Sequence, residues 1–305
     1  MRRVVVTGAT SFVGHELVKQ LLRSGDKVYA IVRPGSPNLA VLLDCAQAEI
    51  IPLDLKDLNL LPIKIKEADV FFHLGWDGSG AEMRSQADIQ QENVSHALKA
   101  VQAAHRLTCS RFVFTGSQAE YGPQNMVLRE DVPCTPVTEY GKAKLSAGIM
   151  TRDAARSFGI AYAHGRIFSV YGPEDHPWTL ISECIRRFSK GEEVALSSCE
   201  QKWNYLYIED AARAIIALSI ADIQEVDPIY NIAGMDTRVL KDFMEELHDL
   251  MGRRGKPCYG SRKSGPERPY SMVPDVGKLV CATGWVPQVS FRDGIQKTLE
   301  RFAKE

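Results

Sequence analysis

Disulfide and metal-binding patterns are missing from this sequence. Seven cysteines are scattered over 305 residues, and no two of them form a CxxC pair. Because their number is odd and their spacing irregular, neither a disulfide framework nor a zinc site is predicted. The seven histidines show no HxxxH or HExxH spacing, so we expect no metal. A reducing, cytoplasmic environment fits this pattern best.

Long apolar runs and an excess of one charge are missing as well. No run approaches the roughly 20 apolar residues that span a bilayer, and the N-terminus enters a predicted strand without a signal-peptide pattern. There are 37 lysines and arginines against 38 acidic residues, which gives a formal charge of -1. Neither nucleic acid nor a membrane is therefore an expected partner. A hydrophobic content of 45% is sufficient for the large core of a soluble enzyme.

The N-terminal segment RRVVVTGATSFVGHELVKQLL predicts a buried strand, a tight loop and a helix. This order is typical of a dinucleotide site. Gly8 permits a sharp turn, Gly14 lets the helix pack against the sheet, and free N–H groups at the helix start face the pyrophosphate. Since Ser11 stands where the motif has its middle glycine, a purely structural turn stays open as the alternative.

The first half of the chain alternates predicted strands with helical segments. The strands cover residues 3–7, 27–33, 48–51, 69–74, 111–115 and 160–167. This alternation predicts an α/β fold with a doubly wound parallel sheet, in which ligands bind beyond the carboxyl ends of the strands. The residues that follow five of these strands should therefore converge on one crevice: Gly8, Arg33, Asp54, Leu74 and Ser117.

Tyr140 and Lys144 lie four residues apart in TEYGKAK, a spacing that puts them on one face of a helix. A phenol is a poor acid or base at neutral pH, and a lysine cation beside it favours the phenolate. Ser117, in FVFTGSQAEYG, would hold the substrate oxygen that Tyr140 protonates or deprotonates. Taken alone, the tyrosine and lysine fit an ordinary solvated helix pair better.

The end of the second predicted strand bears on the choice of cofactor. An acidic residue there would bind the ribose hydroxyls of NAD, whereas an arginine suits the 2′-phosphate of NADP. The strand VYAIV ends in Arg33, and no Asp or Glu follows until Asp44. This pattern favours NADP(H) over NAD(H). The alternative is that Arg33 is simply a solvated residue at the end of the strand.

Motifs along nearly the whole chain resemble the extended short-chain dehydrogenase/reductase family, whose members mostly act on nucleotide-activated sugars. They are TGATSFVG at 7–14, LDL at 53–55, HLGW at 73–76, ENV at 92–94, GSQAEYG at 116–122, YGKAK at 140–144, GRIFSVYGP at 165–173, YLYIEDAARA at 205–214 and TGWVP at 283–287. The resemblance implies a Rossmann domain over 1–170 that is completed by segments around 204–235. It also implies a smaller C-terminal α/β lobe, over 171–203 and 236–305, that binds the substrate.

The resemblance also implies roles for individual residues. Those expected in catalysis are Ser117, Tyr140 and Lys144. Those expected to bind the cofactor are Gly8, Thr10, Ser11, Phe12, Val13, Gly14, Arg33, Asp54, Leu55, Leu74, Gly75, Trp76, Asn93, Tyr140, Lys144 and Ile167. Those expected to bind the substrate are Ser117, Gln118, Tyr140, Ser169, Trp178, Trp203 and Arg268.

Three of the expected cofactor contacts have a structural alternative. Asp54, which with Leu55 resembles the adenine-contacting pair of the family, could equally be a helix N-cap. Asn93 would support a water relay behind Lys144 or be an ordinary buried hydrogen-bonding group. Trp76 replaces a small residue of the family, and would either wall the pocket or pack in the core.

Several expected substrate contacts depart from the family. Arg268 resembles the diphosphate-binding arginine, with a surface arginine as the alternative. Trp203 stands where many relatives have another arginine, which leaves Lys202 and Arg268 as candidate anion contacts. Ser169 replaces a usual asparagine, and Ile167 a usual proline. These departures allow an altered substrate.

The residues after Ser117 bear on the reaction. The 4,6-dehydratases of the family have an Asp-Glu pair there, whereas this chain has Gln118 and Ala119. Without these carboxylates, sugar dehydration by that mechanism is not expected. Because NADP is favoured, we expect NADPH to reduce the C4 ketone of a nucleotide-linked 4-keto-6-deoxyhexose while Tyr140 supplies the proton.

Other functions stay open. A nucleotide-sugar 4-epimerase would use the same three catalytic residues with tightly bound NAD, and a reductase of a non-nucleotide ketone or a non-catalytic NADP sensor is also compatible. Relatives commonly dimerise through the helix that carries Tyr140 and the helix before it, so we expect a homodimer. The outer faces of these helices would contain residues that could also be core: Ala97, Leu98, Val101, Leu145, Ile149 and Met150.

Overall fold

A seven-stranded parallel sheet forms the centre of the molecule in the computed structural model, which describes residues 1–80, 82–223, 228–262 and 271–302. The strand order is β12-β7-β5-β4-β1-β2-β3, and every neighbouring pair is parallel. The chain therefore winds outward from β1 in two directions, as in a Rossmann fold. The predicted fold class is confirmed.

The sheet strands lie close to the positions predicted from the sequence. Six match the predicted ranges: β1 (Arg3–Thr7), β2 (Lys27–Val32), β3 (Glu49–Pro52), β4 (Val70–His73), β5 (Arg111–Ser117) and β7 (Ala161–Ile167). The seventh, β12 (Ile229–Ile232), was not among the predicted strands. Val4, Val5 and Val6 of β1 are fully buried, because a central parallel strand is covered on both faces.

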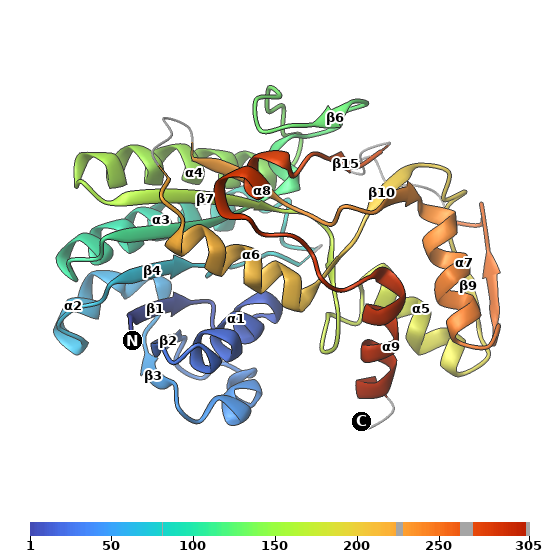
Figure 1. Ribbon diagram of the computed structural model, residues 1–305, viewed down its shortest axis with the longest axis horizontal. Coiled ribbons are helices and arrows are strands. Elements are labelled where there is room, and N and C mark those ends of the chain that lie inside the picture. The colour runs from blue at the N-terminus through green and yellow to red at the C-terminus, as the bar shows by residue number, and fades with distance from the viewer. Residues whose placement is uncertain (81, 224–227, 263–270, 303–305) are drawn as a thin grey trace.

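Helices cover both faces of this sheet (Figure 1). On one face lie α1 (Phe12–Arg23), α6 (Ile208–Ile220) and α8 (Gly277–Thr283), whose apolar side chains share one core cluster with the sheet. On the other face lie α3 (Ala87–Arg106) and α4 (Glu139–Ser157), together with η2 (Leu55–Leu60). The short elements η1 (Leu39–Cys45), α2 (Leu61–Lys64) and η3 (Gln118–Glu120) complete this part.

A smaller body lies to the right of the sheet in Figure 1 and has its own core around Phe188, Phe243 and Ile295. Its helices are α5 (Leu180–Ser189), α7 (Leu240–Leu250) and α9 (Phe291–Phe302). Within the described residues, four short strand pairings surround the cores through β6 (Val127–Leu128), β8 (Val170–Tyr171), β9 (Glu193–Ala195), β10 (Lys202–Asn204), β11 (Leu206–Tyr207), β13 (Thr237–Val239), β14 (Lys256–Cys258) and β15 (Val273–Pro274). The domain boundaries that the resemblance implied stay a prediction.

The buried carboxylate of Asp210, on α6, joins the two parts of the molecule. Its oxygens accept hydrogen bonds from the backbone N–H groups of Gln288, at 3.0 Å, and Val289, at 2.9 Å, just before α9. Trp285 packs in the same place and donates its indole N–H to the Asp210 carbonyl, at 3.2 Å. The returning chain is thereby fixed against the Rossmann sheet.

Two residues expected on the outer faces of α3 and α4 are instead part of this chain's own core. Ala97 and Val101 are fully buried, since they face η2 and the sheet. Ile149 and Met150 of α4 are 45% and 44% exposed, and Leu98 and Leu145 are half-buried. The homodimer stays a prediction. No helix in the described ranges is long and apolar enough to span a membrane.

Candidate active site

The glycine-rich turn between β1 and α1 is shaped for close backbone approach. Gly8 has φ +70°, and a Cβ atom there would lie 2.8 Å from the Gly75 nitrogen. A Cβ atom on Gly14 would collide with the Gly8 carbonyl oxygen. Ser11 caps α1 by accepting a hydrogen bond from the Gly14 N–H at 3.1 Å. These contacts leave the first N–H groups of α1 open at the turn, a geometry that fits a dinucleotide pyrophosphate.

Ser117 ends β5 and begins a capping box with Glu120. The Ser117 Oγ accepts a hydrogen bond from the Ala119 N–H at 3.2 Å, and the Ser117 N–H donates to Glu120 Oε1 at 2.8 Å. With one lone pair engaged, the Ser117 hydroxyl keeps its proton for an outside acceptor. The serine is therefore held as a hydrogen-bond donor.

The Glu120 carboxylate lies behind Ser117 in a buried charge cluster. It accepts from Arg166 Nε at 2.8 Å and pairs with His164 Nε2 at 3.1 Å. Burial opposes ionisation, but the charges of His164 and Arg166 prevail and lower the pKa of Glu120 to about 2. Our sequence analysis did not single out Glu120, although the S-x-x-E spacing from Ser117 is the capping-box signature.

Helix α4 carries Tyr140 and Lys144 to the same place. Thr138 caps the helix by accepting from the Gly141 N–H at 3.0 Å, which sets Tyr140 in the first turn. Lys144 donates to the Thr115 carbonyl at 2.9 Å, and its Nζ lies 5.9 Å from the centre of the Tyr140 ring. The two side chains share a helix face as predicted, and both are buried.

Burial lowers the pKa of Lys144 from 10.5 to about 7. The negative charge of Glu120 opposes this shift, and the positive charge of Arg84 adds to it. The charge state of the buried Lys144 amine near neutral pH therefore depends on burial and on the charges of the neighbouring groups.

Trp76 covers Lys144 at the end of β4. Its ring centre lies 3.8 Å from Lys144 Nζ and 6.0 Å from the Tyr140 ring, in an edge-to-face arrangement. The indole N–H donates to Gln90 Oε1 at 2.9 Å. Trp76 thus lies against Lys144 and Tyr140 and also packs against the core, and its role as a wall of the cofactor or substrate pocket stays a prediction.

Asn93 fixes the loop that follows β4. Its side chain accepts from the Asp77 N–H at 2.8 Å and donates to the Asp77 carbonyl at 2.9 Å and the Ile89 carbonyl at 2.8 Å. These bonds fit the ordinary structural alternative for Asn93. A water relay behind Lys144 stays a prediction.

Arg33 does not stand alone at the end of β2. Its guanidinium Nη1 lies 3.2 Å from a carboxylate oxygen of Asp77, which comes from the loop after β4. The sequence analysis did not identify Asp77, because this carboxylate reaches Arg33 from a strand two positions away in the sheet. A carboxylate at this place disfavours a 2′-phosphate and suits ribose hydroxyls.

The remaining expected cofactor contacts lie along the carboxyl edge of the sheet. Asp54 caps η2 by accepting from the Lys56 N–H at 3.1 Å, as its alternative proposed. Leu55 approaches Gly75 closely, since a Cβ atom added to Gly75 would lie 2.7 Å from a Leu55 methyl carbon. Leu74 donates its N–H to the Thr7 carbonyl at 3.3 Å, and Ile167 is the register partner of Ser117. Thr10, Phe12 and Val13 belong to the turn or the first residues of α1.

The expected substrate contacts are more dispersed. Gln118 is half-buried beside Ser117, and its Oε1 atom is buried without a hydrogen-bond partner within the described residues. Trp178 is 61% exposed and stacks on His176, whereas Trp203 packs between two apolar clusters. The Ser169 carbonyl accepts from the Leu206 N–H at 2.9 Å. Arg268 lies outside the described residues.

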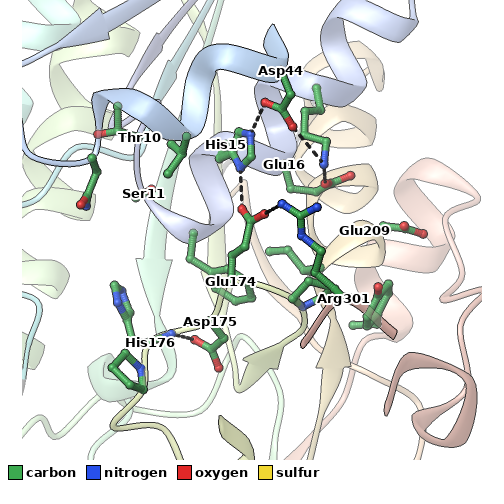
Figure 2. Close-up of a pocket in the computed structure, with 18 residues that line it drawn as sticks. Thr10, Ser11, His15, Glu16, Asp44, Glu174, Asp175, His176, Glu209 and Arg301 are labelled. Carbon is green, nitrogen blue, oxygen red and sulfur yellow. Dashed lines mark hydrogen bonds and ion pairs between the residues drawn. The ribbon is translucent and has the colours of Figure 1, made fainter. Parts of the chain in front are cut away.

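A cavity of about 360 Å³ opens beside the glycine-rich turn (Figure 2). Its lining includes Thr10 and Ser11 at the turn and Arg301 of α9, but not Ser117, Tyr140 or Lys144. His15 lies between two carboxylates, with Nε2 2.8 Å from Asp44 Oδ1 and Nδ1 3.3 Å from Glu174 Oε2. Glu174 in turn accepts from Arg301 at 3.0 Å. This row of charges connects α1 and η1 to α9.

One group of candidate metal ligands lies at the cavity wall. Ligand atoms of His15, Asp44 and Cys45 are within 4.8 Å of one another. Burial, followed by the hydrogen bond to Asp44 and the negative charge of that carboxylate, raises the pKa of the Cys45 thiol to about 12, which disfavours the thiolate that binds metals. The expected absence of a metal stays a prediction.

Comparison with protein families identifies the family to which this chain belongs. Residues 4–233 match the NAD dependent epimerase/dehydratase family. The chain belongs to this family. It is therefore an enzyme of the extended short-chain dehydrogenase/reductase type, as the motifs implied, and the family uses a nicotinamide cofactor.

The similarity to known proteins covers nearly the whole chain. The chain is 27% identical to the low-salt glycan biosynthesis protein Agl12 of Haloferax volcanii, over 98% of each chain. It is 26% identical to MoeE5, solved in complex with UDP-glucuronic acid and NAD, with a TM-score of 0.85 and 99% of each chain covered. A UDP-galactose 4-epimerase structure is 25% identical, with a TM-score of 0.83 and 99% of each chain covered. The chain is thus similar to nucleotide-sugar enzymes.

Proposed function

We propose that this protein is an NAD-dependent 4-epimerase of a nucleotide-linked sugar. The observation that carries the proposal is the convergence of Ser117, Tyr140 and Lys144 at the carboxyl edge of the sheet, with Gln118 and Ala119 where dehydration would need carboxylates. These residues support removal and return of hydrogen at one carbon, without elimination of water.

Each catalytic residue has a distinct task in this proposal. The Ser117 hydroxyl, held as a donor by its capping box, would hydrogen-bond the substrate oxygen at C4. Tyr140 would remove the proton from that oxygen and later return it. Lys144, fixed to the Thr115 carbonyl, would supply the positive charge that favours the phenolate.

The turn from Gly8 to Gly14 would hold the pyrophosphate of NAD, which when bound would accept hydride from C4 and return it. Inversion then requires that the 4-keto sugar present its opposite face before the hydride returns. Asp77 supports NAD over NADP because its carboxylate already engages Arg33. The solved relative MoeE5 was also obtained with NAD.

An NADPH-dependent ketoreductase is the second candidate. It is favoured by the position of Arg33, whose side chain is 57% exposed at the end of β2. A reductase must exchange its cofactor in every cycle, whereas an epimerase can retain it. A cytoplasmic location and a homodimer belong to the proposal for either reaction.

Incubation of the purified protein with UDP-glucose or UDP-galactose, without added cofactor, tests the proposed reaction. UDP carries the sugar in the solved relative MoeE5. Separation of the products should show the C4 epimer of either starting compound and the same final ratio from both. Unchanged sugars in this assay, combined with stoichiometric NADPH consumption on a nucleotide-linked 4-keto sugar, would favour the reductase.

A further inference from the structure

We propose that Arg84 binds a carboxylate of the substrate sugar close to C4, so that the preferred substrates are nucleotide-linked acidic sugars such as uronic acids. The inference rests on the proposed function because it places C4 of the sugar at Tyr140. It assigns a task to a residue that neither the sequence motifs nor the three catalytic residues include.

Arg84 lies directly on the catalytic tyrosine. Its guanidinium carbon is 4.2 Å from the centre of the Tyr140 ring, and its carbonyl accepts a hydrogen bond from the Tyr140 N–H at 3.1 Å. The loop before α3 is therefore joined to the start of α4 by both the backbone and the side chain of Arg84. Any group bound by this guanidinium lies next to the Tyr140 ring.

The Arg84 guanidinium has no hydrogen bond or ion pair with the residues that the structure describes, and its Nε atom is buried without an acceptor. A buried donor that lacks an acceptor costs free energy relative to its hydrated state. An oxygen ligand that enters the site would supply the missing acceptor.

The charges around Tyr140 favour an anionic ligand. Lys144 and Arg84 both lie beside the ring, and Arg84 contributes to the lowered pKa of Lys144. The negative charge of Glu120 acts on Lys144, but Arg166 and His164 already pair with this carboxylate. The site therefore carries an excess of positive charge when Lys144 is protonated.

The chemistry of a nucleotide sugar identifies which anion fits. The diphosphate is attached to C1, on the opposite side of the pyranose ring from C4. A carboxylate at C6 is separated from C4 only by C5, so it lies on the same side as the oxygen that Tyr140 must reach. A planar carboxylate can also accept two parallel hydrogen bonds from a guanidinium.

Calorimetric titration with UDP-glucuronic acid and UDP-glucose separates the carboxylate from the rest of the substrate. We expect the wild-type protein, with its bound cofactor, to bind the uronate at least about tenfold more tightly than the neutral sugar. Arg84→Met should weaken binding of the uronate by about 10- to 100-fold, the range of a lost charged hydrogen bond. Binding of UDP-glucose should change by less than about threefold.

Two further variants control this experiment. Arg84→Lys keeps the charge but not the paired donors, and should fall between wild type and Arg84→Met for the uronate alone. Arg106→Met removes an exposed arginine at the opposite end of α3, whose guanidinium contacts only the Asn59 carbonyl among the described residues, and should match wild type.

Three results would overturn the inference. Equal losses of affinity for both compounds in Arg84→Met would assign Arg84 to the diphosphate, and unchanged affinity for both would give it no role in binding. The third result is a wild-type protein that does not prefer the uronate, including one that binds neither compound. Epimerisation of UDP-glucose without uronate preference would reject the inference and leave the proposed function intact. Uronate preference that depends on Arg84, in a protein without epimerase activity, would reject the proposed function and leave the assignment of Arg84 to the carboxylate intact.

Discussion

The ammonium group of Lys144 lies 3.8 Å from the centre of the Trp76 indole. This contact, together with the hydrogen bond to the Thr115 carbonyl, encloses the lysine among apolar rings and backbone. A cation over an aromatic face is partly stabilised by the ring, but the loss of water outweighs this and lowers the lysine pKa. The proposed catalytic centre thus contains a lysine whose pKa is lowered to about 7 by burial.

The pH dependence of stability should reveal Lys144. Its pKa is about 7 in the folded protein and about 10.5 when unfolded, so the unfolded chain binds more protons between these values. Lys144 therefore makes nucleotide-free protein more stable as pH rises from 7 toward 10, by up to about 1.4 kcal/mol per pH unit. Urea unfolding across this range should show a flatter profile for Lys144→Met. Lys142→Met, an exposed position two residues away, should keep the wild-type slope; identical slopes in all three proteins would contradict the lowered pKa.

Replacement of Tyr140 by Phe should reduce turnover by about 10²- to 10⁴-fold, because it removes the group that exchanges a proton with the C4 oxygen. The amount of bound cofactor should stay within about twofold of wild type. Turnover is measured from epimer formation, and bound cofactor from the nucleotide released on denaturation. Tyr29→Phe, on β2, is the matched control and should leave both unchanged. Near-normal turnover of Tyr140→Phe would remove Tyr140 from the mechanism.

Removal of the buried Glu120 carboxylate should destabilise the protein strongly. Glu120→Ala leaves Arg166 buried without its partner, at a cost of about 3–5 kcal/mol. Glu193→Ala breaks an exposed pair with Lys256 and should cost at most about 1 kcal/mol. Unfolding in urea at pH 7 measures both.

Lowering the pH should diminish the difference in the free energy of unfolding between Glu120→Ala and wild type. The folded pKa of Glu120 is about 2, below the ordinary value of 4.5, so its contribution is complete above 4.5 and is lost as pH falls toward 2. A difference that stays constant down to pH 2 would show that packing, and not charge, accounts for it.

Asp77→Asn tests the origin of the cofactor preference. Since the variant frees Arg33 and removes a negative charge, the affinity for NADP relative to NAD should rise by about tenfold, equivalent to about 1.4 kcal/mol. Asn93 holds the Asp77 backbone, so the loop should keep its position. Titration of nucleotide-free protein with both dinucleotides gives the ratio, and Asp153→Asn, on an exposed part of α4, serves as control. An unchanged ratio would exclude Asp77 from cofactor selection.

Local sequence patterns were sufficient for six of the seven described sheet strands and for the positions of Ser117, Tyr140 and Lys144, whereas the edge strand β12 was not predicted. The strand-turn-helix at Gly8 and the four-residue spacing of Tyr140 and Lys144 each depend on nearby residues, so their geometry could be read from short segments. The partner of Arg33 could not, because Asp77 is 44 residues away and reaches it only through the order of the strands. Arg84 carries no motif, and only the packing of its loop on α4 places it over Tyr140.

Identification of the nucleotide that the purified protein releases on denaturation, by mass spectrometry, tests the central claim most directly. The same protein is then titrated with NADH and NADPH. An epimerase should release NAD in nearly stoichiometric amount, because it retains its cofactor between turnovers. Release of NADP, or an empty protein that prefers NADPH, would contradict the account and favour the ketoreductase.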